Sequence, residues 1–489
     1  PPASANTRAT SGLIYGVFAS GTHFAWPVWV LPWIAAAWLG GLFVGAQWQL
    51  SAGPVLAGVA FAGALLVAVQ ARDLGARLWG VPLSCLAFGC GLGVAHAVPP
   101  PCSAAGDAQV IARVESVRHG LGDARIRLRA LSGRWLESGQ ALPVDLDLTA
   151  RLGSASAPPP GSIIAGRAEL RPRTELHNPS PHPDLSLRGG SGCWARWDEP
   201  SSFEVLEAPA WAAAIDGARA RVRRHMSDAL PPEVAGVARA LVLGDGGALG
   251  YEQRQTIAAV GLAHLFAVSG LHVALVSGTL VRSLHWLVRG AAIGFDPRRL
   301  AAALGIPLTL LHALFAGGSP SAWRAAITAA LTWGLVVIGR RPSASAVTAA
   351  AALILSAPNP AIALRPAFLL SIVATSAILS APRVSPSLRW RRLRASATIS
   401  ARTLIATTPL VWWWFGGIPL IGWLTNILVL PFGSWVVIPL AHLFAVTTTF
   451  PDATETIGAA LTIAVHVLLS VCDAFAPLTP TRRLPPLDV

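Results

Sequence analysis

Long apolar runs alternate with short polar or arginine-rich segments along most of the chain. About 20 apolar residues in succession form a helix long enough to cross a bilayer. Three such runs cover 27–47, 52–71 and 78–98, and after residue 233 others cover 234–249, 255–288, 300–316, 322–339, 344–357, 366–381, 398–416, 418–449 and 455–477. This pattern predicts a mainly α polytopic membrane protein.

The 418–449 run is too long for one span and contains Pro431, Gly433 and Pro439. We expect it to divide into two short or re-entrant pieces, which a membrane tolerates only where protein or a water-filled cavity covers the backbone.

Residues 99–208 have a different pattern, in which apolar and polar positions alternate. Period-2 stretches separated by turn residues predict strands at Gln109–Val117, Ala124–Ala130, Ala141–Leu148, Ser162–Leu170 and Cys193–Leu206. Five short strands predict a small β-barrel, and an OB-fold-like barrel is the first expectation. The segment after it mixes arginines with apolar residues at helical spacing, which is typical of an amphipathic helix at a membrane interface.

The predicted organisation has six parts. They are an N-terminal tail (1–25), three transmembrane helices (26–98), an extracytoplasmic β domain (99–208), the interfacial helix (209–232), a second transmembrane domain (233–480) and a C-terminal tail (481–489).

Composition supports membrane insertion. The 489 residues are 53% hydrophobic and 12% charged, whereas a soluble chain has about 25% charged residues. All 37 basic residues are arginine, and the net charge is +13. Arginine clusters between apolar runs favour cytoplasmic loops, which places the β domain on the other side of the membrane.

The stretch Gly261–Gly278 is almost wholly apolar, yet it contains His264, Ser269 and His272. On a straight helix these residues would lie on roughly one side, and the Ser269-Gly270 step permits a kink there. Polar residues inside such a segment indicate function by default. The alternative is a tight helix contact in which small residues allow close approach and polar residues bond between helices.

Three further polar residues lie in apolar surroundings: Asp245, Arg324 and Asn426. Asp245, beside glycines, is most simply interpreted as a helix cap. Arg324 either serves the functional path or extends its charged end to a membrane interface.

Other candidates lie in the β domain. Arg125, Arg127 and Arg129 alternate onto one strand face, where they either contact phosphates or form an ordinary solvated face. Cys102 and Cys193 both fall in the predicted extracytoplasmic segment, so we expect them to form a disulfide.

Recognisable enzyme motifs are missing from the sequence. It has no P-loop, no Gly-x-Ser-x-Gly and no His-Glu-x-x-His. His177, His182 and Asp184 lack a fixed ligand spacing. We therefore expect no enzymatic activity, no metal and no cofactor.

Several ordered motifs resemble the ComEC family of bacterial competence proteins. They are Gly261–Gly278 itself, Leu241-Val-Leu-Gly-Asp245, Gly318-Ser-Pro-Ser-Ala-Trp-Arg324-Ala325, Asn359-Pro360 with Phe368-Leu-Leu-Ser371, and the series Pro409, Phe415, Asn426 and Pro431. Leu369 replaces the glutamine usual in the family. We expect position 369 to tolerate change, whereas Phe368 and Ser371 face the helix bundle.

The resemblance implies an inner-membrane, multi-pass channel that carries single-stranded DNA into the cytoplasm during natural transformation. It implies an extracytoplasmic DNA receptor and a cytoplasmic motor ATPase or helicase as partners, the lipid bilayer as surroundings, and a possible homo-oligomer. The motif residues expected along the DNA path are Asp245, His264, Ser269, Gly270, His272, Arg324, Phe368, Ser371 and Asn426. Many relatives add a C-terminal metallo-β-lactamase-like domain, which we do not find in this sequence.

Two alternatives stay open. Ser269 with His272 or His264 resembles the nucleophile and base of an intramembrane hydrolase, although no oxyanion or aspartate partner is evident. The interrupted 418–449 run also fits a small-solute transporter with discontinuous helices.

Overall fold

A computed structural model describes most of the chain after residue 104. The described residues are 13–15, 25–27, 35–38, 105–120, 123–144, 146–153, 157–172, 193–197, 203–266, 270–290, 296–340, 343–357, 366–380, 391–415 and 421–478. The predicted transmembrane helices at 26–98 lie almost entirely outside them. The chain forms two compact units, Pro1–Ala97 with Ser283–Ile306 and Ala330–Leu364, and Val98–Arg282 with Pro307–Ala329 and Arg365–Val489.

In the first unit, β1 (Leu13–Tyr15) pairs antiparallel with β2 (Ala25–Pro27). The indole of Trp38 donates a 2.8 Å hydrogen bond to Ser356 Oγ.

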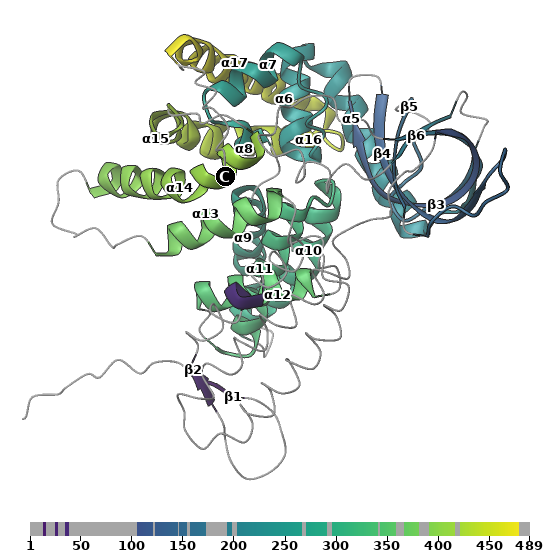
Figure 1. Cartoon of the computed structure of the whole chain (residues 1–489). Helices are drawn as coiled ribbons and strands as arrows, with labels where there is room; N and C mark the ends of the chain where they lie inside the picture. Colours follow the sequence, from purple (N-terminus) through teal and green to yellow (C-terminus); the bar gives the residue numbers. More distant parts are fainter. Residues whose placement is uncertain are drawn as a thin grey trace, which may run out of the picture. The chain divides into compact units, whose positions relative to one another are not determined.

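The second unit contains the predicted β-barrel (Figure 1). Its strands are β3 (Gly106–His119), β4 (Asp123–Trp135), β5 (Asp147–Gly153), β6 (Ile163–Pro172), β7 (Cys193–Arg196) and β8 (Phe203–Glu207). They hydrogen-bond in the order β3-β4-β5-β7-β6-β8, and a β3–β6 pairing closes a ring of five strands. Only the β5–β7 pair in this ring is parallel. This arrangement confirms the small barrel and fits an OB-like fold.

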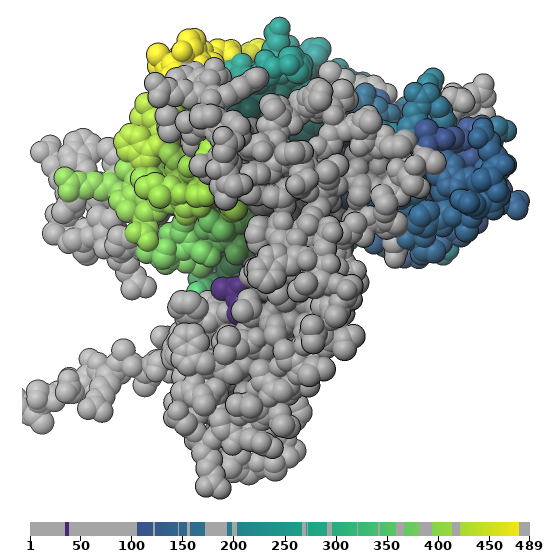
Figure 2. All heavy atoms as spheres, in the orientation of Figure 1, coloured from purple at the N-terminus to yellow at the C-terminus, as the bar shows by residue number. Residues whose placement is uncertain are grey.

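Alternation along the strands explains why the barrel closes. In β4, Ala124, Ile126, Leu128 and Ala130 are buried, while the residues between them face outward. Period-2 burial is what a strand with one face on a core requires. In Figure 2 the barrel residues, in blue, form one rounded surface.

Two predicted strands differ from the structure. The third begins at Asp147, later than the expected 141–148, and the last is divided into β7 and β8. Pro143 lies in the expected third strand but lacks the backbone N–H that a sheet ladder needs. The chain therefore makes only an isolated bridge to β4 before it, at Ala141, and the continuous strand begins after it.

Helices α5 to α17 follow the barrel in sequence. They are α5 (Ala210–Ala229), α6 (Pro232–Leu243), α7 (Tyr251–Ala259), α8 (Ala263–Phe266), α9 (Gly270–Val288), α10 (Pro297–Phe315), α11 (Pro320–Val337), α12 (Ala344–Ser356), α13 (Pro366–Leu379), α14 (Arg391–Phe415), α15 (Gly422–Phe432), α16 (Ile438–Val446) and α17 (Thr454–Phe475), with short turns η3 (Gly433–Val437), η4 (Pro451–Ala453) and η5 (Ala476–Leu478).

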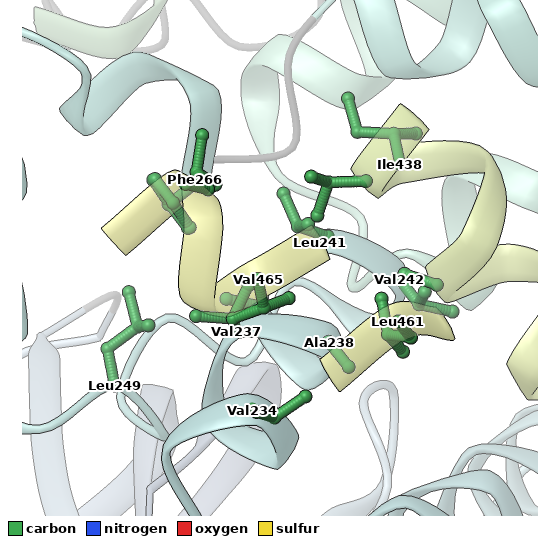
Figure 3. Packing of buried hydrophobic residues seen from close by; sticks show 14 of the residues in the cluster. Val234, Val237, Ala238, Leu241, Val242, Leu249, Phe266, Ile438, Leu461 and Val465 are labelled. Carbon is green, nitrogen blue, oxygen red and sulfur yellow. The ribbon is translucent and has the colours of Figure 1, made fainter. Parts of the chain in front are cut away.

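Helix α6 lies at the centre of the larger helical core. Its side chains Val237 and Leu241 pack beside Val465 and Leu461 of α17 and Ile438 of α16 (Figure 3). A second, smaller core joins α9, α10 and α11 through alanines and Val273. Small side chains allow helices to approach closely, which is how helices associate in membranes.

Residues 422–446 correct the expectation of two separate pieces. They form one continuous helical run in which η3 is a π-helical turn between α15 and α16. Pro439 lies in the first turn of α16, directly after this π-helical turn. The hydrogen-bond pattern of the helix therefore changes locally at η3, but the helix does not end there.

Among the described residues, three helical segments are long and apolar enough to cross a membrane. They are Pro297–Phe315, Gly422–Val446 and Pro451–Leu478, and shorter apolar helices cover Ser321–Val337, Ala344–Ser356 and Pro366–Leu379.

Candidate functional site

The apolar helices of the second unit contain polar side chains in two groups. We call Arg324, Ser371 and Gly270 the arginine site, and His264, His272, His312 and His442 the histidine cluster. Ionisable groups inside apolar helices are costly, so each group is a candidate site.

The arginine site joins three helices. Arg324 of α11 is 5% exposed, and its Nε donates a 2.8 Å hydrogen bond to Ser371 Oγ of α13. A Cβ added to Gly270, at the start of α9, would lie 3.1 Å from Arg324 Nη2. The missing side chain at Gly270 therefore leaves room for the guanidinium against this helix.

No carboxylate balances Arg324 in the described part of the chain. None of the ion pairs there includes Arg324, whose side-chain hydrogen-bond partner is the neutral hydroxyl of Ser371. Arg324 is buried inside the protein, which favours the functional-path alternative over extension of its charged end to a membrane interface. The site holds an uncompensated positive charge with donors suited to a phosphate oxygen.

The histidine cluster brings together side chains from four helices. His272 is 1% exposed and interacts electrostatically with His264, His312 and His442. The ring centroids of His312 and His442 lie 5.7 Å apart. His264 is exposed, and its Nδ1 lies 3.0 Å from the Gly261 carbonyl oxygen.

Some ring nitrogens of the histidine cluster lack a hydrogen-bond partner among the described residues. Nε2 of His312 and Nε2 of His442 are buried without a hydrogen-bond partner among the described residues. A neutral imidazole both donates and accepts, so these atoms suit water or a passing polar ligand. No group of three or more potential ligands in the described residues is arranged to hold a metal ion.

The first two histidines lie on either side of residues 267–269, which are outside the described residues. Gly261, with φ +78°, lies in the turn between α7 and α8; His264 is in the short α8 and His272 is in α9. Ser269 lies outside the described residues, and α9 begins directly after it at Gly270.

The π-helical turn η3 precedes His442 and packs on α8. A Cβ added to Gly433 would lie 2.8 Å from Leu265 Cδ2, so a larger residue there would force the Leu265 side chain to move. Thr425 of α15 donates a 2.7 Å hydrogen bond to the Val260 carbonyl, which fixes the start of the histidine-bearing segment. Asn426 Oδ1 is buried and has no hydrogen-bond partner among the described residues.

The motif around residue 368 lies on α13. Phe368 is fully buried, Leu369 is partly buried, and Ser371 contacts Arg324 as described above.

Asp245 has a different environment from the one expected. It is 1% exposed and pairs with Arg223 at 2.9 Å, Arg219 at 3.4 Å and Arg239 at 3.7 Å. The helix-cap interpretation is wrong, because Gly244 ends α6 in the left-handed conformation and Gly250 precedes α7.

The same segment contacts the barrel. Arg239 Nη2 donates a 2.8 Å hydrogen bond to the Gly120 carbonyl, and Gly120 forms a parallel β-bridge with Gly247. A Cβ on Gly247 would lie 3.1 Å from the His119 carbonyl oxygen. Gly247 therefore lets the start of the β3–β4 turn pack closely on this segment.

The three candidate arginines of the barrel interact with other side chains of the barrel. Arg127 pairs with Asp147, Arg129 pairs with Glu115 at 2.6 Å, and the Arg125 guanidinium lies 4.9 Å from the Trp194 ring. This arrangement favours the alternative of an ordinary outer face over a phosphate-binding stripe.

Cys193 is buried and disulfide-bonded. Its predicted partner Cys102 lies outside the described residues, so the pairing stays a prediction. Cys472 is a buried free thiol.

Sequence reasoning overlooked two members of the histidine cluster and the surroundings of Asp245. His312 and His442 each interrupt an apolar run, which was the available signal. Arg219 lies on the predicted interfacial helix (209–232) but is buried; among the arginines of this helix, Arg221 and Arg224 are the exposed ones.

The fold and these sites define a largely helical protein with segments able to cross a membrane and an OB-like barrel. Residues 241–485, half of the chain, match the family model described as "Competence protein". The chain belongs to this competence protein family. The match contains both the arginine site and the histidine cluster.

Comparison with curated and solved proteins adds one relative. "Competence protein ComA" of Neisseria gonorrhoeae is 29% identical over 277 residues, which cover 54% of this chain and 36% of the relative. The aligned region therefore spans about a third of that relative's length. No solved structure matches this chain.

Proposed function

We propose that this protein conducts single-stranded DNA across the bacterial inner membrane into the cytoplasm during natural transformation. Membership of the competence family and the apolar helices support a membrane role in DNA uptake. The observation that carries the finer proposal is Arg324, a buried cation whose described hydrogen-bond partner is the neutral Ser371.

Moving a polyanion through hydrocarbon requires a hydrated path with positive charge and hydrogen-bond donors along it. Arg324 supplies the charge, and Ser371 fixes its orientation. The histidine cluster and Asn426 supply neutral groups that exchange hydrogen bonds with water or phosphate. In this proposal Gly270 and Phe368 shape the path, and Ser269 contributes a hydroxyl.

The proposed channel works with other proteins. An extracytoplasmic receptor delivers the DNA, and a cytoplasmic motor ATPase or helicase pulls it, since the sequence has no P-loop. We propose that the chain itself is not an enzyme and that it functions as a multi-pass protein, with a homo-oligomer as one arrangement.

The test compares Arg324→Gln with Arg282→Gln, which changes an exposed arginine on α9. Cells carrying each variant would be supplied with labelled DNA, and cytoplasmic label would be measured at matched membrane protein level. We expect Arg324→Gln to lower uptake at least tenfold, because a charge-assisted phosphate contact contributes about 1.5–3 kcal/mol. DNA uptake by cells carrying Arg282→Gln should be close to uptake by cells carrying the natural protein.

Arg324→Lys separates charge from packing. Lysine keeps the positive charge but loses the guanidinium fork, so uptake should be intermediate. Normal uptake by Arg324→Gln at normal protein level would refute a role for this residue in the DNA path.

A further inference from the structure

Three arginines surround one buried carboxylate where α5, α6 and the following turn meet. We call Arg219, Arg223 and Arg239 the arginine triad. Their side chains are 6%, 11% and 7% exposed, and the Asp245 side chain is 1% exposed.

Charge does not balance in this cluster. Asp245 is the carboxylate paired with the triad within 4 Å in the described residues. Asp216, one turn before Arg219 in α5, acts on Arg219 at longer range and still leaves positive charge in excess. His119 adds none at neutral pH, because burial and the nearby Arg223 lower its pKa to about 4.

Hydrogen bonding is also incomplete. Arg219 Nη2 donates to the Leu243 carbonyl at 2.9 Å, and Arg239 Nη2 donates to the Gly120 carbonyl at 2.8 Å. However, Arg219 Nε, Arg223 Nη2 and Arg239 Nε are buried without a hydrogen-bond partner among the described residues. Buried unpaired donors and uncompensated charge are both destabilising, so a native ligand that supplies acceptors and negative charge is favoured.

We infer that the arginine triad binds a phosphate group, supplied by an anionic lipid headgroup or by free phosphate. Guanidinium groups donate in a planar fork that matches phosphate oxygens, and several forks around one anion give the strongest contacts. The exposed Arg221 of α5 adds attraction for an anionic surface. This site lies apart from the arginine site in sequence and does not depend on DNA conduction.

Thermal unfolding of the full chain in neutral detergent tests the inference. Phosphate would be titrated against chloride at constant ionic strength. We expect phosphate to raise the Tm of the natural protein, with an apparent affinity about tenfold weaker in Arg223→Gln, which loses one charged donor. Arg224→Gln, an exposed neighbour on α5, is the matched control and should respond like the natural protein.

Lipid and free phosphate are separated in nanodiscs. If a lipid headgroup is the ligand, phosphatidylglycerol should raise the Tm relative to phosphatidylcholine, and added phosphate should then have little further effect. Free phosphate as the ligand predicts the same phosphate response in both lipids. Arg223→Lys keeps the charge and provides a folded comparison if Arg223→Gln is poorly stable.

Equal phosphate responses in the natural protein and both Arg223 variants would overturn the inference. A Tm that responds to neither phosphate nor phosphatidylglycerol would also overturn it. Stabilisation by a single-stranded oligonucleotide alone would assign the triad to DNA and exclude a lipid or free phosphate.

Discussion

Arg324 and Asp245 are both buried charges, but their surroundings differ. Asp245 is surrounded by three guanidinium groups, whereas Arg324 contacts a hydroxyl and a glycine. A buried carboxylate stabilises the fold when the cations that pair with it remain in contact with it. A single cation without a described counter-charge is better suited to a negatively charged ligand that binds and dissociates.

Histidine 119 makes stability depend on pH. Its folded pKa of about 4 lies below the ordinary 6.5, because burial disfavours the charged ring. Between these values the unfolded chain binds a proton that the folded chain does not, so stability is full above about pH 6.5 and falls towards pH 4. The linked loss is about 3 kcal/mol across that window.

Thermal unfolding of the full chain from pH 7.5 to 4.5 measures this effect. His119→Gln should flatten the part of the profile below pH 6.5 relative to that of the natural protein. Identical slopes for the natural protein and His119→Gln would contradict the prediction.

At the scale of elements, the sequence predicted the strands and helices whose positions depend on local residue patterns. Alternation located the long strands β3, β4 and β6, and apolar length located α11, α12, α13 and α17 within a few residues. It did not reveal the break after α7 or the π-helical turn η3. Both depend on packing: Thr425 bonds to Val260, and Gly433 accommodates Leu265.

The same difference between local pattern and packing applies to the residues of the candidate sites. His264, His272 and Arg324 could be selected from the sequence because each is polar within an apolar run. Their neighbours could not, since His312 and His442 are far away in the chain and meet the others only after the helices pack.

The turn η3 should determine whether His442 reaches His312. Groups in contact are coupled by at least about 0.5 kcal/mol, so His312→Ala and His442→Ala should have non-additive effects on unfolding. Deleting Val436 removes one residue from the π turn and rotates His442 by about 100°. In that background the two substitutions should become additive.

A double-mutant cycle measured by thermal unfolding checks this coupling. His312→Ala with His466→Ala is the control pair, expected to be additive within about 0.5 kcal/mol because His466 is exposed and bonds to Glu233. Additive behaviour of His312 and His442 in the undeleted chain would argue against their contact.

At the scale of the second unit, Asp245 joins the barrel to the helices. It pairs with Arg239, which also donates to the Gly120 carbonyl of the barrel. Asp245→Asn removes the carboxylate charge from the arginine triad, so we expect a loss of about 3–5 kcal/mol of stability. Asp228→Asn, at an exposed position of α5, should have little effect.

Thermal unfolding and limited proteolysis of both aspartate variants measure that loss. Faster cleavage near α5 and α6 should accompany the lower Tm of Asp245→Asn. A Tm equal to that of Asp228→Asn would mean that the carboxylate contributes little to joining the two parts.

The parallel bridge between Gly120 and Gly247 has a consequence for how the protein can evolve. Hairpin turns normally tolerate insertions and drift in sequence, since they face solvent. The β3–β4 turn has less of that freedom, because a change that moves the Gly120 carbonyl would break its hydrogen bond with Arg239. Evolutionary variation in the barrel is therefore directed to its other loops, and this one hairpin should change only together with the segment 239–247.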